Sequence, residues 1–169
     1  MTAAELSFDA GDMTPAELAE AFATLPEVLG DHLEDAAHDI GLKFGSEAAE
    51  NAPSDTGDLR SDLIEPMVER VGETIVEIRV GSNLPQAKPM EEGTPPGHFP
   101  PPSELRDWAR RVLGDPNAAY PVARSIAETG LEAREYLADA FDDQSNITFA
   151  LDKIAEAVSA AFAEVGLDV

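Results

Sequence analysis

The spacing of apolar residues along the chain changes close to residue 52. Before that point apolar side chains recur at intervals of three and four residues, which is the period of an amphipathic helix. Thr14, a proline and then Glu17 form a typical helix start, so we predict a long helix over residues 14–51. A second start-like sequence, Thr24–Glu27, predicts a break or kink within this helix.

The segment that follows the helix has the composition of a tight structural turn. A proline ring cannot continue the helical hydrogen-bond ladder, and short polar side chains bond to nearby backbone groups. Glycine adopts the positive φ that a sharp reversal needs, and a following leucine supplies an apolar anchor. The predicted turn residues are Pro53, Asp55, Thr56, Gly57 and Leu59.

Beyond the turn, the pattern alternates with a period of two and predicts a small antiparallel sheet. Residues 63–71 form a weak strand, and residues 74–82 form the clearest one because apolar and charged residues alternate there. A reversal at Gly72-Glu73 joins them into a β-hairpin that packs on the long helix. Met90–Thr94 predicts a short third strand, so the sheet extends over residues 63–94.

The rest of the chain is predicted as a proline-rich loop followed by helices. Thr94–Pro102 contains five prolines and forms a stiff extended connection. Apolar residues at helical spacing predict helices over residues 103–165, with helix ends at Gly114 and Gly130. A polar break is expected at Asp142–Asn146, before a closing helix that runs to residue 165.

These elements define an α+β fold class: a long N-terminal helix packed on a small antiparallel sheet, followed by C-terminal helices. The chain of 169 residues is long enough for one domain with a real core, which we place at residues 14–165. Residues 1–13 have no clear period and predict a flexible N-terminal arm, and residues 166–169 form a tail.

Composition excludes several classes of protein. An apolar fraction of 43% favours a globular protein over a disordered one. The chain has no cysteine, so it can form neither a disulfide framework nor a thiolate zinc site. We expect no membrane association and no export signal, because no run approaches about 18 apolar residues and the start lacks a basic opening.

The charge balance is strongly acidic. The chain has 34 acidic and 11 basic side chains, a net charge of −23, and the acids are spread over every segment. Such a field opposes binding to nucleic-acid backbones. Two interpretations stay open: adaptation to high salt, where screening removes the self-repulsion, or a surface that is repulsive by function. Only three basic residues are lysines, which favours a salt-adapted, halophilic host.

No constellation of residues indicates catalysis, a metal site or a cofactor. His32 and His38 are six residues apart on the predicted long helix, and His98 stands alone in the proline-rich loop, so they lack metal-ligand spacing. Adjacent acids such as Glu91-Glu92 are expected by chance in so acidic a chain. No nucleophile elbow and no glycine-rich phosphate loop is present. We therefore expect a protein that is not an enzyme.

Three blocks in order resemble the tail-completion, or head–tail joining, neck proteins of long-tailed phages and tailed archaeal viruses. The first block runs from Ala52 to Ser61, and the second comprises Met90–Thr94 with the proline-rich run into Leu105 and Trp108-Ala109. The third comprises Val122–Ile126, Gly130, Tyr136-Leu137 and Ala140. Together the blocks cover roughly residues 14–165, nearly the whole chain.

The resemblance implies a structural virion protein in the head–tail connector, or neck. It implies a homo-oligomeric ring, commonly a hexamer, that completes the tail and joins it to the DNA-filled head. The implied partners are a portal-side connector or stopper protein and a tail-tube or tail-terminator protein. Viral DNA would pass through the lumen without specific binding, and assembly would take place in the host cytoplasm.

A set of residues outside the turn forms the candidate interface. Three arginines at positions 106, 110 and 111 form the only local basic cluster of the sequence. This cluster is either a solvated helix face or a contact with an acidic neighbouring subunit. The proline-rich loop is either a linker or a stiff docking segment. The candidate interface residues are Glu91, Gly93, Thr94, Phe99, Arg106, Arg110 and Arg111.

Two other classes of function stay open. One is a soluble acidic binding module, such as a DNA mimic that blocks a nucleic-acid-binding protein. The other is a hydrolase that uses acidic residues such as Asp55 or Glu91. The three ordered blocks favour the virion protein over both.

Overall fold

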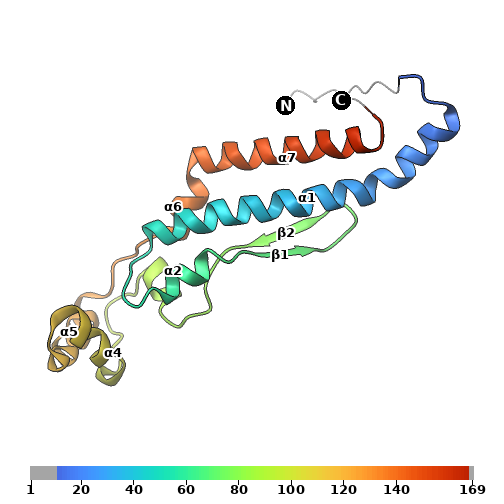
Figure 1. Cartoon of the computed structure of the whole chain (residues 1–169). Helices are drawn as coiled ribbons and strands as arrows, with labels where there is room; N and C mark the ends of the chain where they lie inside the picture. The colour runs from blue at the N-terminus through green and yellow to red at the C-terminus, as the bar shows by residue number, and fades with distance from the viewer. Residues whose placement is uncertain (1–10, 168–169) are drawn as a thin grey trace. The chain divides into compact units, whose positions relative to one another are not determined.

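The computed structural model describes residues 11–167, and the chain is mainly helical with one small sheet (Figure 1). The predicted α+β class, with a long N-terminal helix, an antiparallel hairpin and C-terminal helices, is confirmed. Most of the arm predicted at residues 1–13 and part of the tail predicted at residues 166–169 lie outside the described residues. The elements in chain order are α1 (Pro15–Asn51), α2 (Asp58–Leu63), β1 (Met67–Arg70), β2 (Val76–Arg79), α3 (Ala87–Glu92), α4 (Pro102–Trp108), the π-helix η1 (Ala109–Leu113), the 3₁₀-helix η2 (Pro116–Ala118), α5 (Ala119–Thr129), α6 (Tyr136–Asp142) and α7 (Gln144–Glu164).

The contacts divide the chain into two compact units. Unit 1 consists of residues 1–45, 65–80 and 142–169, and therefore holds most of α1, the hairpin and α7. Unit 2 consists of residues 46–64 and 81–141, and holds the last turns of α1 together with the elements from α2 to α6 outside the hairpin. The predicted extent of a single domain, residues 14–165, stays a prediction.

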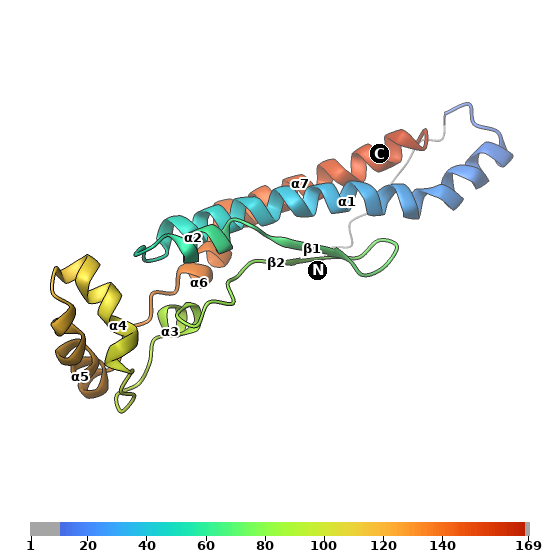
Figure 2. The ribbon, with the colours of Figure 1, turned by 60° about the horizontal axis from the view of Figure 1, so that its bottom comes forward.

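Helix α1 begins as the sequence predicts, with reciprocal bonds between Thr14 and Glu17. The Glu17 carboxylate accepts the Thr14 backbone N–H at 2.7 Å, and the Thr14 hydroxyl accepts the Glu17 N–H at 3.3 Å. These bonds lower the pKa of the Glu17 carboxyl. The sequence predicts a break or kink at Thr24–Glu27; the helix continues through Pro26, so there is no break. Its N-terminal turns do change direction relative to the rest (Figures 1 and 2).

The hairpin of unit 1 packs along α1. Strands β1 and β2 are antiparallel, with Val68 opposite Ile78. Two α1 glycines allow the close approach: a Cβ on Gly41 would lie 2.6 Å from the Pro66 side chain, and a Cβ on Gly30 would overlap the Arg70 guanidinium. The strands are shorter than the predicted residues 63–71 and 74–82, and Leu63 belongs to helix α2.

Helix α7 lies along a different side of α1 from the hairpin (Figures 1 and 2). Ala21 of α1 and Phe162 of α7 share a small buried cluster with Leu167. The Lys153 ammonium on α7 lies 3.2 Å from the Asp39 carboxylate on α1. The polar break predicted at Asp142–Asn146 is shorter than expected, since Asp143 caps α7 by accepting the Ser145 N–H at 2.7 Å.

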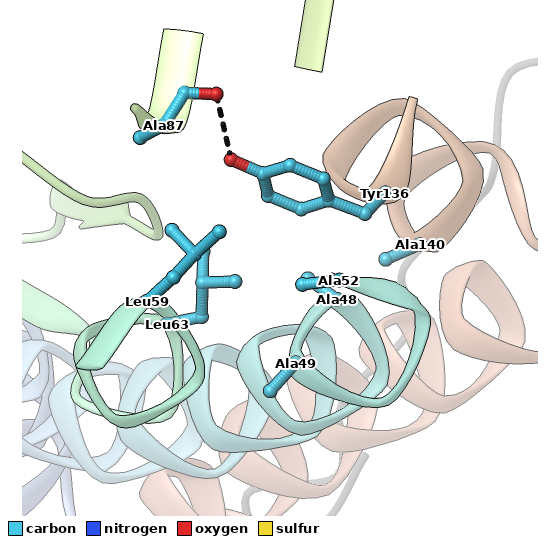
Figure 3. Close-up of a cluster of buried hydrophobic side chains, with 8 residues drawn as sticks. All are labelled: Ala48, Ala49, Ala52, Leu59, Leu63, Ala87, Tyr136 and Ala140. Atoms are coloured by element: carbon cyan, nitrogen blue, oxygen red, sulfur yellow. Dashed lines mark hydrogen bonds between the residues drawn. The ribbon is translucent and has the colours of Figure 1, made fainter. Parts of the chain in front are cut away.

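Unit 2 has its own apolar core, built from segments far apart in sequence (Figure 3). The Tyr136 ring packs with the end of α1, with α2 and with α3, and its hydroxyl donates to the Ala87 carbonyl at 3.0 Å. Burial, and secondarily the negative charge of Glu91, raise the pKa of the Tyr136 phenol. The buried residues of this core are Ala48, Ala49, Ala52, Leu59, Leu63, Ala87, Tyr136 and Ala140.

The predicted third strand is wrong. Residues 87–92 form helix α3, and the sheet within residues 11–167 has two strands. Pro89 is compatible with this helix because it lies in the first turn, where backbone N–H groups have no helical acceptor. Thr94 pairs with Leu131 instead, in an isolated antiparallel bridge.

The helix ends predicted at Gly114 and Gly130 are confirmed, while several helices begin at other residues than the pattern predicts. Helix α4 continues into the π-helix η1, which ends at Gly114 with φ +74° as the sequence predicts. Helix α5 starts before Pro121 and is followed by Gly130 with φ +80°. Helix α6 begins only at Tyr136, after an extended stretch.

Candidate functional site

The predicted turn residues form a corner between α1 and α2. Gly57 takes φ +93° immediately before α2, a conformation that favours glycine. The Thr56 hydroxyl donates to the Asp58 carboxylate at 2.7 Å. Arg60 on α2 donates through Nε and Nη2 to the carbonyl of Ala52, at 3.0 and 2.7 Å. A guanidinium therefore ties the start of α2 to the end of α1, where the last carbonyls lack helical partners.

Asp55 in this corner binds the π-helix η1. The Arg111 Nε donates to Asp55 Oδ1 at 2.9 Å, and Arg111 Nη2 donates to Oδ2, so the pair is bidentate. The hydrogen bonds from Arg111 hold the pKa of the Asp55 carboxyl below its ordinary value, and those to Asp55 raise the pKa of Arg111. Asp55 is therefore a structural anchor between the corner and η1.

Glu91 on α3 serves as the cap of α6. Its two carboxylate oxygens accept the backbone N–H groups of Leu137 and Ala138, each at 3.0 Å. These N–H groups lie in the first turn of α6, where no helical acceptor is available. The backbones of the two segments are also joined, since the Arg134 N–H donates to the Met90 carbonyl at 2.9 Å.

Gly93 and Thr94 form a close crossing with Gly130 and Leu131. The Thr94 and Leu131 backbones exchange two hydrogen bonds of 2.9 Å. A Cβ on Gly93 would lie 2.6 Å from the Leu131 carbonyl oxygen, and a Cβ on Gly130 would lie 2.3 Å from that of Thr94. Both glycines have positive φ, so both backbone conformation and space require glycine there.

Thus the structure brings most of the three sequence blocks that carry the family resemblance together inside unit 2. The corner, α3 and α6 share one core, and the second and third blocks cross at Thr94–Leu131. Glu91, Gly93 and Thr94, predicted as interface residues, have partners within the chain.

The three clustered arginines differ in their surroundings. Arg111 is bound to Asp55, whereas Arg110 pairs with Asp107 on its own helix at 2.6 Å. Arg106 is exposed and forms no ion pair with any residue in the range 11–167. Phe99 is 44% exposed and packs edge-on against the 60% exposed ring of Tyr120, with centroids 6.0 Å apart.

An open groove of about 480 Å³ lies in unit 1 between α1 and the start of the hairpin. Four polar side chains of α1 line it at positions i, i+3, i+4 and i+7, which share one helix face. Two residues of the hairpin segment supply apolar lining. The lining residues are Asp31, Glu34, Asp35, His38, Pro66 and Val68.

The other sequence candidates are dispersed. His32 bonds to Glu164 at 2.8 Å, His38 lines the groove of unit 1, and His98 lies in the proline-rich loop of unit 2. Over residues 11–167, no three metal-ligating side chains gather closely enough to hold an ion. None of the described helices has the length and apolar character needed to cross a membrane.

Residues 16–93 match the family model HK97-gp10-like, described as "Bacteriophage HK97-gp10, putative tail-component". The matched range is a little under half of the chain and includes α1, the corner, the hairpin and α3. Comparison with curated proteins and with solved structures finds no significant match. The family match confirms the resemblance to a phage head–tail or tail-completion family, and it indicates a tail component of a virion.

Sequence reasoning missed the residues that act over long sequence separations. Arg60 was part of the first block, but nothing in the sequence indicated that it binds the Ala52 carbonyl. Arg70 was not singled out, yet it donates to the Glu73 carbonyl at 2.8 Å and to the Asp31 carboxylate at 2.5 Å. The sequence signal that could have indicated the role of Arg70 is its position at the end of a strand, just before a turn that contains Gly72.

Proposed function

We propose that this chain is a structural protein of the virion neck, which forms a ring that completes the tail and joins it to the DNA-filled head. The observation that carries the proposal is the match of residues 16–93 to a phage tail-component family. The role is architectural and not enzymatic. Its neighbours are a portal-side connector and a tail-tube or tail-terminator protein.

The architecture of the described residues supports this role. Asp55 and Glu91, the acids considered for catalysis, bind Arg111 and the α6 backbone, which leaves neither poised for acid–base chemistry. A lumen wall built from a chain whose net charge is −23 would be acidic and would repel DNA phosphates, so the genome would slide without sticking. Reversing acids that face the lumen to lysine is then expected to slow DNA exit while assembly proceeds.

Disruption of the gene in the virus that encodes this chain tests the proposal directly. We expect filled heads and finished tails to accumulate separately, and addition of the purified protein to the lysate to join them into infectious particles. Labelled antibody should bind intact particles between head and tail. Normal particles without the protein, or joined particles that lack the label in the neck, would refute the proposal.

The strong negative charge also favours a second candidate, an acidic binding module such as a DNA mimic. Such a module would inhibit a nucleic-acid-binding protein in proportion to its concentration. Inhibition of a DNA-binding protein in molar salt, together with absence from purified particles, would support the mimic over the neck protein.

A further inference from the structure

Residues 95–130 differ in charge from the rest of the chain. This segment, which contains α4, η1, η2 and α5, carries four acidic and four arginine side chains. The remainder of the chain carries 30 acidic and 7 basic side chains. A neutral, arginine-bearing segment in so acidic a protein is less strongly repelled by a copy of the same protein than the acidic remainder is.

The same segment buries few large side chains of its own. Its residues with under 9% exposure are three alanines, at positions 109, 119 and 123. Large apolar side chains remain outside, including Val112 at 53% and Leu113 at 50% exposed. An apolar surface beside arginines has the composition of an interface, in which apolar contacts are combined with charge complementarity.

Arg106 and Arg110 are the cations available to a partner. They are four residues apart where α4 passes into η1, so their side chains are neighbours along the helix surface. Arg106 forms no ion pair within residues 11–167, and the Arg110–Asp107 pair is highly exposed, at 61% and 71%. Breaking that exposed pair costs little.

The unit 1 groove offers the complementary surface. Glu34 and Asp35 on α1 are exposed and form no ion pair with any described residue. Asp31 and Asp35 repeat the four-residue spacing of the two arginines. Pro66 and Val68 add apolar lining beside the acids. The groove therefore offers both acidic side chains for the arginines and apolar surface for the exposed valine and leucine of the arginine-bearing segment.

We propose that the face formed by Arg106, Arg110, Val112 and Leu113 docks into the Asp31–His38 groove of a second copy of this chain. The proposal rests on the proposed ring, because it names the contact that would build it. The two surfaces differ, so each copy carries one donor face and one receiving groove. Such heterologous contacts close into rings when the rotation between copies permits it.

Cysteine cross-linking tests the contact without requiring a stable ring, since the full chain contains no cysteine. The L113C and V68C variants are mixed at high protein concentration and oxidised. We expect a covalent dimer that contains one copy of each variant. A matched mixture of V68C with L151C, whose leucine is 62% exposed on α7, controls for random collision. A yield no greater than that of the control overturns the proposal.

Charge exchange gives a second, independent result. Adding R106E/R110E to the L113C chain should reduce the cross-link at least about tenfold, because like charges then face each other. Adding E34R/D35R to the V68C chain should restore it. The control R79E/R134E makes the same change in net charge at exposed arginines outside residues 95–130 and should leave the yield unchanged. Equal loss in the control, or no rescue, refutes the contact.

The cross-linking result and the presence of the protein in particles can be told apart, so the contact and the neck role are tested separately. Particles that carry the protein in the neck while V68C and L113C fail to cross-link would overturn this contact and keep the neck role. A specific cross-link in a protein absent from particles would keep the contact and overturn the neck role.

Discussion

Replacing Glu91 by alanine removes both acceptors that cap α6. In the structure the carboxylate binds the N–H groups of Leu137 and Ala138 at 3.0 Å each. The Leu137 N–H is partly buried, so water replaces the lost carboxylate poorly there. The Ala138 N–H is exposed and can bond to water instead. Most of the stability lost in the alanine variant therefore comes from the bond to the Leu137 N–H.

The magnitude follows from these two environments. A hydrogen bond to a charged group contributes about 1.5–3 kcal/mol, and loss of a helix N-cap costs about 0.5–2 kcal/mol. With one bond partly buried and one exposed, E91A should lower the free energy of unfolding by about 2 kcal/mol. For a chain of this size that corresponds to a fall in Tm of about 4–8 °C. E91Q keeps one amide oxygen as an acceptor and should lose about half as much.

Urea unfolding at fixed salt, followed by circular dichroism, measures this loss. E92A is the matched control, because Glu92 is 63% exposed and makes one weak pair with Lys88 at 3.7 Å. It should change the free energy of unfolding by less than about 0.5 kcal/mol. An E91A protein as stable as the wild type, or an E92A loss of equal size, would refute the capping role. If E91A is as stable as the wild type, Glu91 is instead favoured as an interface residue.

Three further results are expected. G93A should lower the free energy of unfolding by at least about 3 kcal/mol, since a Cβ at φ +72° would lie 2.6 Å from the Leu131 carbonyl oxygen. The control G81A, where a Cβ would meet open space, should leave the free energy of unfolding unchanged in the same urea assay. R70M should cost about 2 kcal/mol by loss of the bonds to Glu73 and Asp31, and limited proteolysis should then cut the hairpin faster. Arg111 lowers the pKa of Asp55, so this carboxylate stabilises the fold above its ordinary pKa of 3.8 and loses that contribution as pH falls through the lower folded value. D55N should therefore lose less stability than wild type between about pH 5 and pH 2; an identical fall would contradict the pairing.

The long helices could be predicted because their signals are repeated along the sequence. Helix α1 follows the apolar period and the Thr14 cap, and the hairpin follows the alternation through Val76 and Ile78. Of the predicted break or kink at Thr24–Glu27, the break is absent while the N-terminal turns of α1 do change direction, since one missing N–H and a local clash can bend a helix without ending it when helical residues on both sides pack in unit 1. Summed tertiary contacts decided this position over the local signal.

The third strand could not be excluded from the local sequence. The local pattern of Met90–Thr94 predicts a strand, whereas in the fold Met90 lies in helix α3 and packs against the core of Tyr136, whose hydroxyl bonds to Ala87 at a separation of 49 residues. Similarly, the sequence predicts Leu59 as an apolar anchor of the turn, while in the fold Leu59 and Leu63, four residues apart, form the buried face of helix α2. Short segments carry too few periods to distinguish helix from strand.

The arginine cluster shows the same limit at the candidate site. Spacing alone made Arg106, Arg110 and Arg111 equivalent, because all three lie within six residues. Only the fold shows that Arg111 reaches Asp55, 56 residues away, while Arg106 has no such partner within the described chain. A role for a charged side chain depends on what lies opposite it in space, which periodicity does not encode.

The paired backbones of Thr94 and Leu131 have a consequence for how such a protein diversifies. Residues 95–130 begin and end at this pairing within unit 2, where two 2.9 Å hydrogen bonds hold it, and the Arg111–Asp55 bonds join them to the corner. Doubling the length of a flexible loop with fixed ends costs only about 0.6 kcal/mol in closure entropy, so insertions in the connections between the helices of this segment cost little. The family match ends at Gly93, just before the crossing. The segment proposed to contact a second copy can thus vary in length between its fixed ends, while the residues that match the family model stay unchanged.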